Sequence, residues 1–233
     1  MYDQALFLQT LTGFTQSLVV PHNTQDVLEQ LTESVSAVLG ITGSGVSLAV
    51  EDRLTLATAV PPRVAELEQF QERSQQGPGV EAYRSGKVVT VTDLSQGEHE
   101  WGDYTKVASR LGLAAVAATP LVLGAVHLGA LTLYAAEPRT WPSDDVAVVV
   151  ALGTLATACL VNDSRLHKQQ ELVSQLQQAL DSRVVVEQAK GMVAEAEGIS
   201  VGEAFEAIRR YSRDHNTGLR SVAADIVHRG LRP

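Results

Sequence analysis

Hydrophobic residues in the first forty positions recur at the spacing of an α-helix, three or four residues apart. One set shares the face of a first helix and comprises Leu6, Leu11, Phe14 and Leu18. A second set has the same period and comprises Val27, Leu28, Leu31, Val35, Val38 and Leu39. Pro21 ends the first segment. Asn23 or Thr24 caps the second and Gly40 closes it, so the pattern predicts two amphipathic helices.

The pattern then changes to alternation with a period of two, which is typical of strands that bury one face. Two alternating runs flank Glu51-Asp52 and comprise Val46, Leu48 and Val50 before it and Leu54, Leu56 and Thr58 after it. We expect a tight turn at Glu51-Asp52 and therefore a β-hairpin. Residues 114–123 and 126–136 are longer apolar runs joined around Gly124, and they predict a second hairpin.

Shorter elements connect the two hairpins. A helix follows Pro61-Pro62, the string Gly77-Pro78-Gly79 interrupts the chain, and residues 87–91 form a short strand. Residues 101–111 are expected to be helical. The order of helices, hairpin, helices, strand, hairpin and closing helix indicates an α+β domain, an antiparallel sheet with flanking helices.

The helix that closes this domain is capped by Ser143-Asp144-Asp145 and has no stop signal before residue 196. Leu166, Val173 and Leu180 lie seven residues apart on it, with Leu176 between them and glutamines around them. Such a stripe needs a partner to cover it. It can pack against its own domain, or against a second copy in a short coiled coil. We favour the coiled coil, and with it a homodimer.

The end of the chain continues as helices. Gly198 ends the long helix, and Ser200 with Glu203 three residues later fits the capping box that begins another. The apolar face of this next helix comprises Ala204, Ala207, Ile208 and Tyr211. A turn at Asn216-Thr217-Gly218 precedes a third helix, whose apolar face comprises Leu219, Val222, Ala223 and Ile226. The tail is therefore expected to be an all-α three-helix module on a long connecting helix.

These elements divide the chain into an α+β domain at residues 1–160, a coiled-coil connector at 161–175 and the helical module at 176–233. Charge follows the division. Residues 1–160 hold 8 Lys and Arg against 17 Asp and Glu, which accounts for the whole net charge of −9. Residues 207–233 hold six arginines against two aspartates. A basic segment on an acidic protein is typical of nucleic-acid binding, although a solvated helix face has the same composition.

Composition is that of an ordinary globular protein, 45% hydrophobic and 19% charged. The single cysteine, Cys159, suits a reducing compartment. The N-terminus lacks the basic residues of a signal peptide. The apolar stretch at residues 111–136 is broken by Thr119, Pro120 and Gly124, and no run approaches the roughly 20 residues of a membrane span. We therefore expect a cytoplasmic protein without membrane association.

Two strings of the long helix resemble the first helix of the ANTAR family, LQQALDSR at residues 176–183 and VEQAKGMV at residues 186–193. The later helices match as well, in Glu203, Ala204, Phe205, Ile208 and Arg209, and in Asn216, Leu219, Val222, Ala223, Ile226 and Val227. The resemblance runs without gaps over residues 171–231. ANTAR domains bind RNA hairpins and relieve transcription termination. The resemblance therefore implies an antitermination regulator whose partner is hairpin RNA. A dimer would carry two such basic modules and engage two hairpins with increased avidity.

The upstream domain resembles a GAF domain, a signal-sensing module that is often paired with ANTAR in actinobacterial regulators. This resemblance rests on the order of elements and on generic features such as Pro120-Leu121 and Gly129-Ala130-Leu131. It implies an unidentified small-molecule or protein signal. Inhibition and activation of the tail by this domain both stay open, and we expect no cofactor.

Candidate RNA contacts are polar or cationic residues of the tail, and they comprise Arg183, Gln188, Lys190, Gly191, Arg209, Arg213, Asn216 and Arg220. Arginine pairs with phosphate or guanine and stacks on bases. Gln188 and Asn216 can read base edges. Gly191 leaves the backbone open to close approach. Arg220 opens the third helix, where free backbone N–H groups also favour a phosphate.

Each candidate has an alternative role. At 100° per residue, the buried stripe of the first tail helix comprises Val186, Ala189 and Val193. Arg183 and Lys190 fall on one flank with Glu187 between them, so they can simply pair with this glutamate. The later arginines can be solvated. Tyr211 is either a core residue, which we favour, or a platform on which a base stacks.

No catalytic motif is evident, since the chain has no P-loop, HExxH, GxSxG or CxxC string. The six histidines show no ligand spacing. His99-Glu100 lies in a polar loop where a metal site is improbable, and His127 is more simply a satisfied strand residue. Cys159 lies within a helix, a poor place for chromophore attachment. We therefore expect neither an enzyme nor a metal site.

Two alternatives to an RNA-binding regulator stay open. A DNA-binding regulator would place a helix in a major groove, but the third tail helix offers Asp225 among its few polar residues, which is ill-suited to that role. A non-catalytic sensor or scaffold would act through protein contacts alone and leave its arginines solvated.

Overall fold

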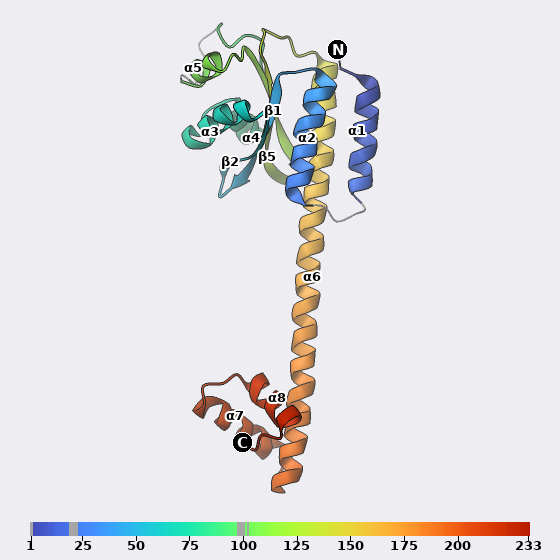
Figure 1. The fold of residues 1–233 in the computed structure, drawn as a ribbon, viewed down its shortest axis with the longest axis vertical. Coiled ribbons are helices and arrows are strands. Elements are labelled where there is room, and N and C mark those ends of the chain that lie inside the picture. The colour runs from blue at the N-terminus through green and yellow to red at the C-terminus, as the bar shows by residue number, and fades with distance from the viewer. Residues whose placement is uncertain (1, 19–22, 97–100, 102) are drawn as a thin grey trace. The chain divides into compact units, whose positions relative to one another are not determined.

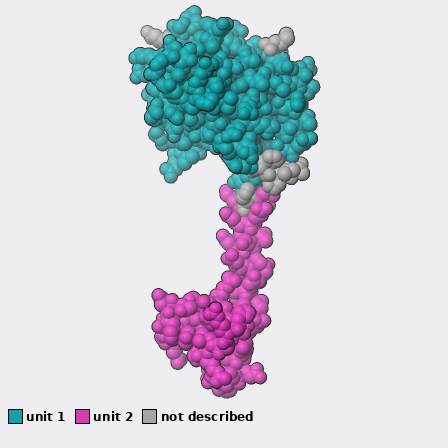
Figure 2. Space-filling view, viewed as in Figure 1, with its two compact units in different colours: residues 1–165 teal, residues 166–233 magenta. Residues whose placement is uncertain are grey.

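The computed structural model of the protein describes residues 2–18, 23–96, 101 and 103–233, without the side chains of residues 167 and 179. The chain divides into two units, Met1–Arg165 and Leu166–Pro233 (Figure 2). Pro21, expected to end the first helix, and the pair His99-Glu100 lie outside the described residues.

An antiparallel sheet forms the centre of the first unit. Its described strands are β1 Gly43–Val50, β2 Arg53–Val60, β3 Val89–Val91, β4 Ala115–Leu123 and β5 Val126–Ala135. They lie in the order β2-β1-β5-β4-β3, and each neighbouring pair is antiparallel. Both predicted hairpins are present, which confirms the α+β prediction.

The turn of the first hairpin has the geometry that its sequence predicts. Glu51 and Asp52 have positive φ angles of 50° and 59°, as a two-residue type I′ turn requires. This turn matches the right-handed twist of the strands, and Val50 pairs with Arg53 directly beside it. In the second hairpin Gly124 takes the positive φ, 61°, without a steric cost.

Helices cover both faces of the sheet (Figure 1). One face carries α1 Gln4–Ser17, α2 Thr24–Leu39 and the first part of α6 Ser143–Glu197. The other carries α3 Ala65–Ser74, α4 Pro78–Ser85 and α5 Asp103–Arg110, with a 3₁₀ turn at Pro62–Val64 before α3. Because side chains alternate along a strand, Leu133 packs in the first core and Tyr134, its neighbour on β5, packs in the second.

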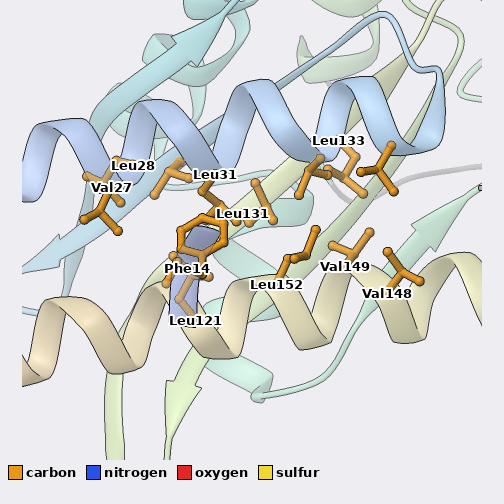
Figure 3. Close-up of a cluster of buried hydrophobic side chains, with 14 of the residues drawn as sticks. Phe14, Val27, Leu28, Leu31, Leu121, Leu131, Leu133, Val148, Val149 and Leu152 are labelled. Carbon is orange, nitrogen blue, oxygen red and sulfur yellow. The ribbon is translucent and has the colours of Figure 1, made fainter. Parts of the chain in front are cut away.

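The larger core lies between α1, α2, α6 and the sheet. Phe14 is fully buried there beside Leu31 and Leu121 (Figure 3). Burying a side chain of this size stabilises the fold by roughly 1.5–3 kcal/mol relative to leaving it in water. The predicted caps of α2 are also confirmed, since the Asn23 side chain accepts a hydrogen bond from the Gln25 N–H and Gly40 adopts the left-handed conformation.

One helix of this unit differs from the sequence prediction. The string Gly77-Pro78-Gly79, expected to interrupt the chain, contains the start of α4. Pro78 stands in the first turn, where its missing N–H breaks no helical hydrogen bond. The strand that follows α4 is shorter than predicted, since it was expected at residues 87–91 and extends only over Val89–Val91.

α6 runs without a break from Ser143 to Glu197, as predicted, and belongs to both units. Ser143, Asp144 and Asp145 form its first turn rather than preceding it. The prediction that no apolar run approaches a membrane span is wrong, because α6 contains an 18-residue stretch with a mean hydropathy of 1.8. Half of this stretch is buried inside the protein, as in the core helix of a globular domain.

The second unit is all-α, as predicted. The end of α6, α7 Val201–Asp214 and α8 Leu219–Arg229 enclose a small core of Ala189, Val193, Ala204, Ile208, Val222, Ala223 and Ile226. The predicted capping box begins α7. The Glu203 N–H donates to Ser200 Oγ at 3.2 Å, and the Ser200 N–H donates to Glu203 Oε2 at 2.9 Å.

Candidate nucleic-acid interface

Two of the predicted RNA contacts, Lys190 of α6 and Arg209 of α7, lie against the same aromatic ring. The Lys190 ammonium nitrogen is 5.3 Å from the centroid of the Phe205 ring, and the Arg209 guanidinium carbon is 5.7 Å from it. The face of an aromatic ring attracts cations through its quadrupole. Phe205 is half-buried on α7, so it brings two cations from different helices to one place.

Each of these cations also has a carboxylate partner three residues earlier on its own helix. Lys190 Nζ donates to Glu187 Oε2 at 2.9 Å, and Arg209 Nη1 donates to Glu206 Oε1 at 3.1 Å. The Lys190 side chain is only 17% exposed, whereas the other three side chains are about half exposed. Exposed ion pairs contribute about 1 kcal/mol at most, so they orient these side chains more than they stabilise the fold.

The remaining α6 candidates, Arg183, Gln188 and Gly191, are all exposed. A Cβ atom built at Gly191 would meet nothing within 4 Å. Packing inside the chain therefore does not require glycine at this position, and the helix backbone is open to approach from outside.

Arg213 lies in the last turn of α7, Asn216 lies between α7 and α8, and Arg220 lies at the start of α8. Asn216 adopts a left-handed φ of 48°, which asparagine tolerates, and its N–H donates to the Arg213 carbonyl at 3.2 Å. Arg220 lies in the first turn of α8, whose N-cap residue, Gly218, offers no side chain to the free N–H groups. All three candidate side chains are exposed.

Tyr211 packs on the core of the second unit, as the favoured alternative predicts. Its ring also stacks on His215, with centroids 3.9 Å apart and planes inclined by 17°. Nδ1 of His215 lies 3.0 Å from the Tyr211 carbonyl oxygen and helps to hold the two rings together.

Sequence reasoning missed Phe205 and Glu206 as members of this surface, whereas Glu187 was expected there as a partner of Arg183 and Lys190. An aromatic residue within a helix is usually assigned to the core, and Glu206 resembles an ordinary solvated charge. A detectable signal was nevertheless present, because a glutamate stands three residues before Lys190 and another three residues before Arg209. Side chains at this spacing meet on a helix surface.

The first unit holds a buried polar network centred on Glu68 of α3, which is 1% exposed. Its carboxyl group accepts hydrogen bonds from Tyr134 Oη at 2.6 Å, Ser47 Oγ at 3.1 Å and Gln71 Nε2 at 3.3 Å. Gln71 in turn accepts a hydrogen bond from the Gly79 N–H at 2.9 Å. The network thereby ties α3 and α4 to β1 and β5.

Burial has a measurable consequence for the acid–base chemistry of this network. Desolvation raises the pKa of Glu68 above its usual value of 4.5, although the hydrogen bonds from Tyr134 and Ser47 oppose the shift. The pKa of Tyr134 is raised well above its usual range by burial and by the nearby Glu68 carboxyl group. Tyr104 is buried in the same region and its pKa is raised for the same two reasons.

The aromatic residues considered for a ligand pocket are largely core residues. Tyr104 packs against Phe70 and Trp101, with ring centroids 6.3 Å and 5.8 Å apart. Beside α4 and β3 the surface is hollowed into an open depression of about 930 Å³, whose lining includes Val80, Arg84, Val89 and Trp101. A signal molecule could approach the first unit through this depression.

The described histidine and cysteine residues form no further metal site. His127 is exposed at the start of β5, and Cys159 is buried in α6, where burial raises the pKa of its thiol. Among the described residues, no three His, Cys, Asp or Glu side chains are grouped to hold a metal ion.

Comparisons with known proteins support both resemblances. Residues 174–227 match the family model of the ANTAR domain, and residues 21–161 match that of the GAF domain. The chain shows no significant match to any curated protein.

Several solved GAF domains share the fold of the first unit. The GAF domain of a phosphoenolpyruvate-protein phosphotransferase from Acinetobacter has 14% sequence identity and a TM-score of 0.54, over 72% of this chain and 99% of that one. The corresponding domain from Coxiella burnetii has 14% identity and a TM-score of 0.54, over 71% and 99%. GAF3 from Slr1393 of Synechocystis has 15% identity and a TM-score of 0.53, over 64% and 99%.

Identities this low establish the fold alone, whereas the family-model matches cover both parts of the chain. The GAF match spans more than half of the 233 residues and includes the sheet with the helices on both of its faces. The ANTAR match includes the Phe205 ring and both of its cations. The chain therefore belongs to the GAF domain family and carries an ANTAR domain, the composition of a regulator that joins a sensing domain to an RNA-binding one.

Proposed function

We propose that this protein is a cytoplasmic, non-catalytic transcription antitermination regulator that binds RNA hairpins through its ANTAR domain under the control of its GAF domain. The observation that carries the proposal is the ANTAR match at residues 174–227. The signal at the GAF domain is an unidentified small molecule or protein, and no cofactor or membrane takes part.

The surface of the ANTAR domain supports RNA as its ligand. Lys190 of α6 and Arg209 of α7 meet at one ring, and exposed Arg183, Arg213 and Arg220 add positive charge on α6, α7 and α8. Single-stranded RNA loops are recognised by contacts to phosphates, by stacking and by hydrogen bonds to base edges. Arginine can make all three contacts, and Gln188 and Asn216 supply amide groups for base edges.

The exposed apolar stripe of α6 supports a homodimer. Leu166, Val173 and Leu180 are 39%, 65% and 59% exposed, and Leu176 is 57% exposed. The stripe therefore does not pack on its own chain, which was the alternative to a coiled coil. A second copy of α6 would cover it with the heptad packing of a coiled coil. Two ANTAR domains on one dimer would then engage two hairpins with increased avidity.

The test uses the full chain and an RNA that carries two hairpins with loops enriched by selection from a randomised pool. Binding of this RNA is compared with binding of random single-stranded RNA and duplex DNA of equal length. Lys190→Ala and Arg209→Ala should each weaken binding of the hairpin RNA about ten- to hundredfold, since a charge-assisted hydrogen bond contributes about 1.5–3 kcal/mol. Lys168→Ala, an equal loss of charge on α6 before the ANTAR match, should have little effect.

Other results of this binding test would support one of the alternative functions. Tight binding to duplex DNA would support a DNA-binding regulator, and equal weak binding to all three nucleic acids, unaffected by the substitutions, would support a sensor that acts through protein contacts. If hairpin RNA binds, transcription past a terminator that overlaps the second hairpin should rise when the protein is added. No rise would contradict antitermination.

A further inference from the structure

One arrangement of charges occurs on two different helices of the ANTAR domain. On α6, Glu187 precedes Lys190 by three residues and pairs with it, and on α7, Glu206 stands in the same relation to Arg209. Both cations also approach the Phe205 ring, at 5.3 Å and 5.7 Å from its centroid. Two positive and two negative side chains therefore gather around one aromatic residue.

The groups that contact these two cations, the Phe205 ring and the two glutamate carboxylates, differ in how freely they can move. Phe205 is half-buried on α7, so its ring has less freedom to move than an exposed side chain. The side chains of Glu187 and Glu206 are 56% and 55% exposed, and such side chains can swing into water at little cost. When the carboxylates move away, the ring still attracts both cations and keeps them close together.

We propose that Phe205 positions Lys190 and Arg209 for RNA phosphates, and that Glu187 and Glu206 are resident counter-ions which those phosphates displace. This inference rests on the proposed function, because it takes RNA as the ligand of the surface. A phosphate offers the same anionic acceptor oxygens as a carboxylate and can replace it at each cation. The Arg209 guanidinium can bind a phosphate through its edge while its face stays on the Phe205 ring.

A consequence follows for the two glutamates. In the free protein each carboxylate neutralises one cation, and in the complex it stands as a negative charge beside an incoming phosphate. RNA therefore has to compete with both carboxylates, and their removal should tighten binding. Ordinary solvated glutamates would have an effect no larger than that of any other negative charge on the domain.

The first arm of the test measures dissociation constants of full-length Glu187→Gln, Glu206→Gln and the double variant for the selected two-hairpin RNA. Each single variant should bind about two- to fivefold more tightly, the range that an exposed ion pair of up to about 1 kcal/mol implies. Glu195→Gln is the matched control, because it removes the same charge from an exposed position on α6. It should bind like the wild type.

The second arm tests the ring. Phe205→Leu removes the π-face and should weaken RNA binding about five- to thirtyfold, as expected for the loss of two cation–π contacts. Phe205→Tyr keeps the ring and should bind within about twofold of the wild type. Hydrogen exchange of the α7 amides shows whether either variant has lost the fold. Rescue by tyrosine but not by leucine, with equal protection of α7, assigns the effect to the ring.

Failure of this inference can be distinguished from failure of the proposed function. If the wild type does not prefer hairpin RNA, the function itself fails. If hairpin RNA binds and Arg209→Ala weakens it, but neither glutamine variant binds more tightly than Glu195→Gln, the counter-ion role is overturned. If Phe205→Tyr binds as weakly as a folded Phe205→Leu, the positioning role of the ring is overturned.

Discussion

At the scale of single residues, Glu68 links the stability of the GAF domain to pH. Burial raises its pKa in the folded chain above the usual 4.5, so the folded chain holds this proton more tightly than the unfolded chain. The resulting stabilisation is fully present below pH 4.5 and is lost as the pH rises through the raised pKa. We expect Glu68→Gln, which has no proton to lose, to reduce the decline in unfolding free energy as the pH rises above 4.5.

Urea unfolding at a series of pH values measures this effect, since the free energy of unfolding follows from the denaturation midpoint and slope. Glu33→Gln on α2 is the control, because Glu33 is exposed and makes no part of the buried network. The pH dependence of this control should match that of the wild type. An equally steep decline in Glu68→Gln would contradict the assignment of the proton to Glu68.

Residues that act through local contacts could be predicted from the sequence, and residues that act through distant ones could not. The pairing of Lys190 with Glu187 was one of two predicted alternatives because both stand on one helix three residues apart. Glu68 gives no such signal. Its partner Tyr134 comes from β5, 66 residues along the chain, so its burial appears only once the sheet has formed. Phe205 escaped prediction for the same reason, because Lys190 reaches it from another helix.

At the scale of elements, the start of α7 depends on the capping box of Ser200 and Glu203. The hydrogen bonds from Ser200 also hold the pKa of the Glu203 carboxyl group below its usual value. Ser200→Ala leaves the Glu203 N–H without its side-chain acceptor and should destabilise the helix by about 1 kcal/mol. Hydrogen exchange of the α7 amides in the full chain measures this loss, as faster exchange in the first turns.

Ser200→Thr is the matched control, because threonine keeps a hydroxyl group that can accept the same hydrogen bond. It should exchange nearly as slowly as the wild type. Equal exchange rates for Ser200→Ala and Ser200→Thr would show that the cap does not determine where α7 begins.

Most helices and strands could be predicted because their ends carry local signals. Asn23, Gly40, Glu51-Asp52 and Ser200 each satisfy a specific backbone requirement that acts within a few residues. α4 was missed because Pro78 was taken as an interruption. A proline in the first turn is compatible with a helix, and tertiary contacts of Val80 with Leu54 and Ala130 then favour the helical conformation.

At the scale of the whole molecule, α6 is the only described helix that contributes to both units. Its first part packs in the GAF core, and its last part supplies Ala189 and Val193 to the ANTAR core. Amphipathic periodicity predicted which face of α6 is buried in its first part and in its last part. The stripe between them has the same periodicity but is exposed, and we propose that a second copy of α6 covers it.

The proposed dimer rests on this stripe, and substitutions in the stripe should abolish dimerisation without disturbing the fold. Val173 and Leu180 are 65% and 59% exposed, so Val173→Asp with Leu180→Asp adds charge to a seam between copies and leaves both cores intact. Sedimentation velocity should show monomers, because like charges would face each other in the coiled coil. Gln178→Asp, on the opposite face of α6, should stay dimeric.

The double variant should also bind two-hairpin RNA at least about 100-fold more weakly while it binds a single hairpin normally, since avidity alone is lost. A wild-type monomer, or equal loss on one hairpin, would contradict dimerisation through α6.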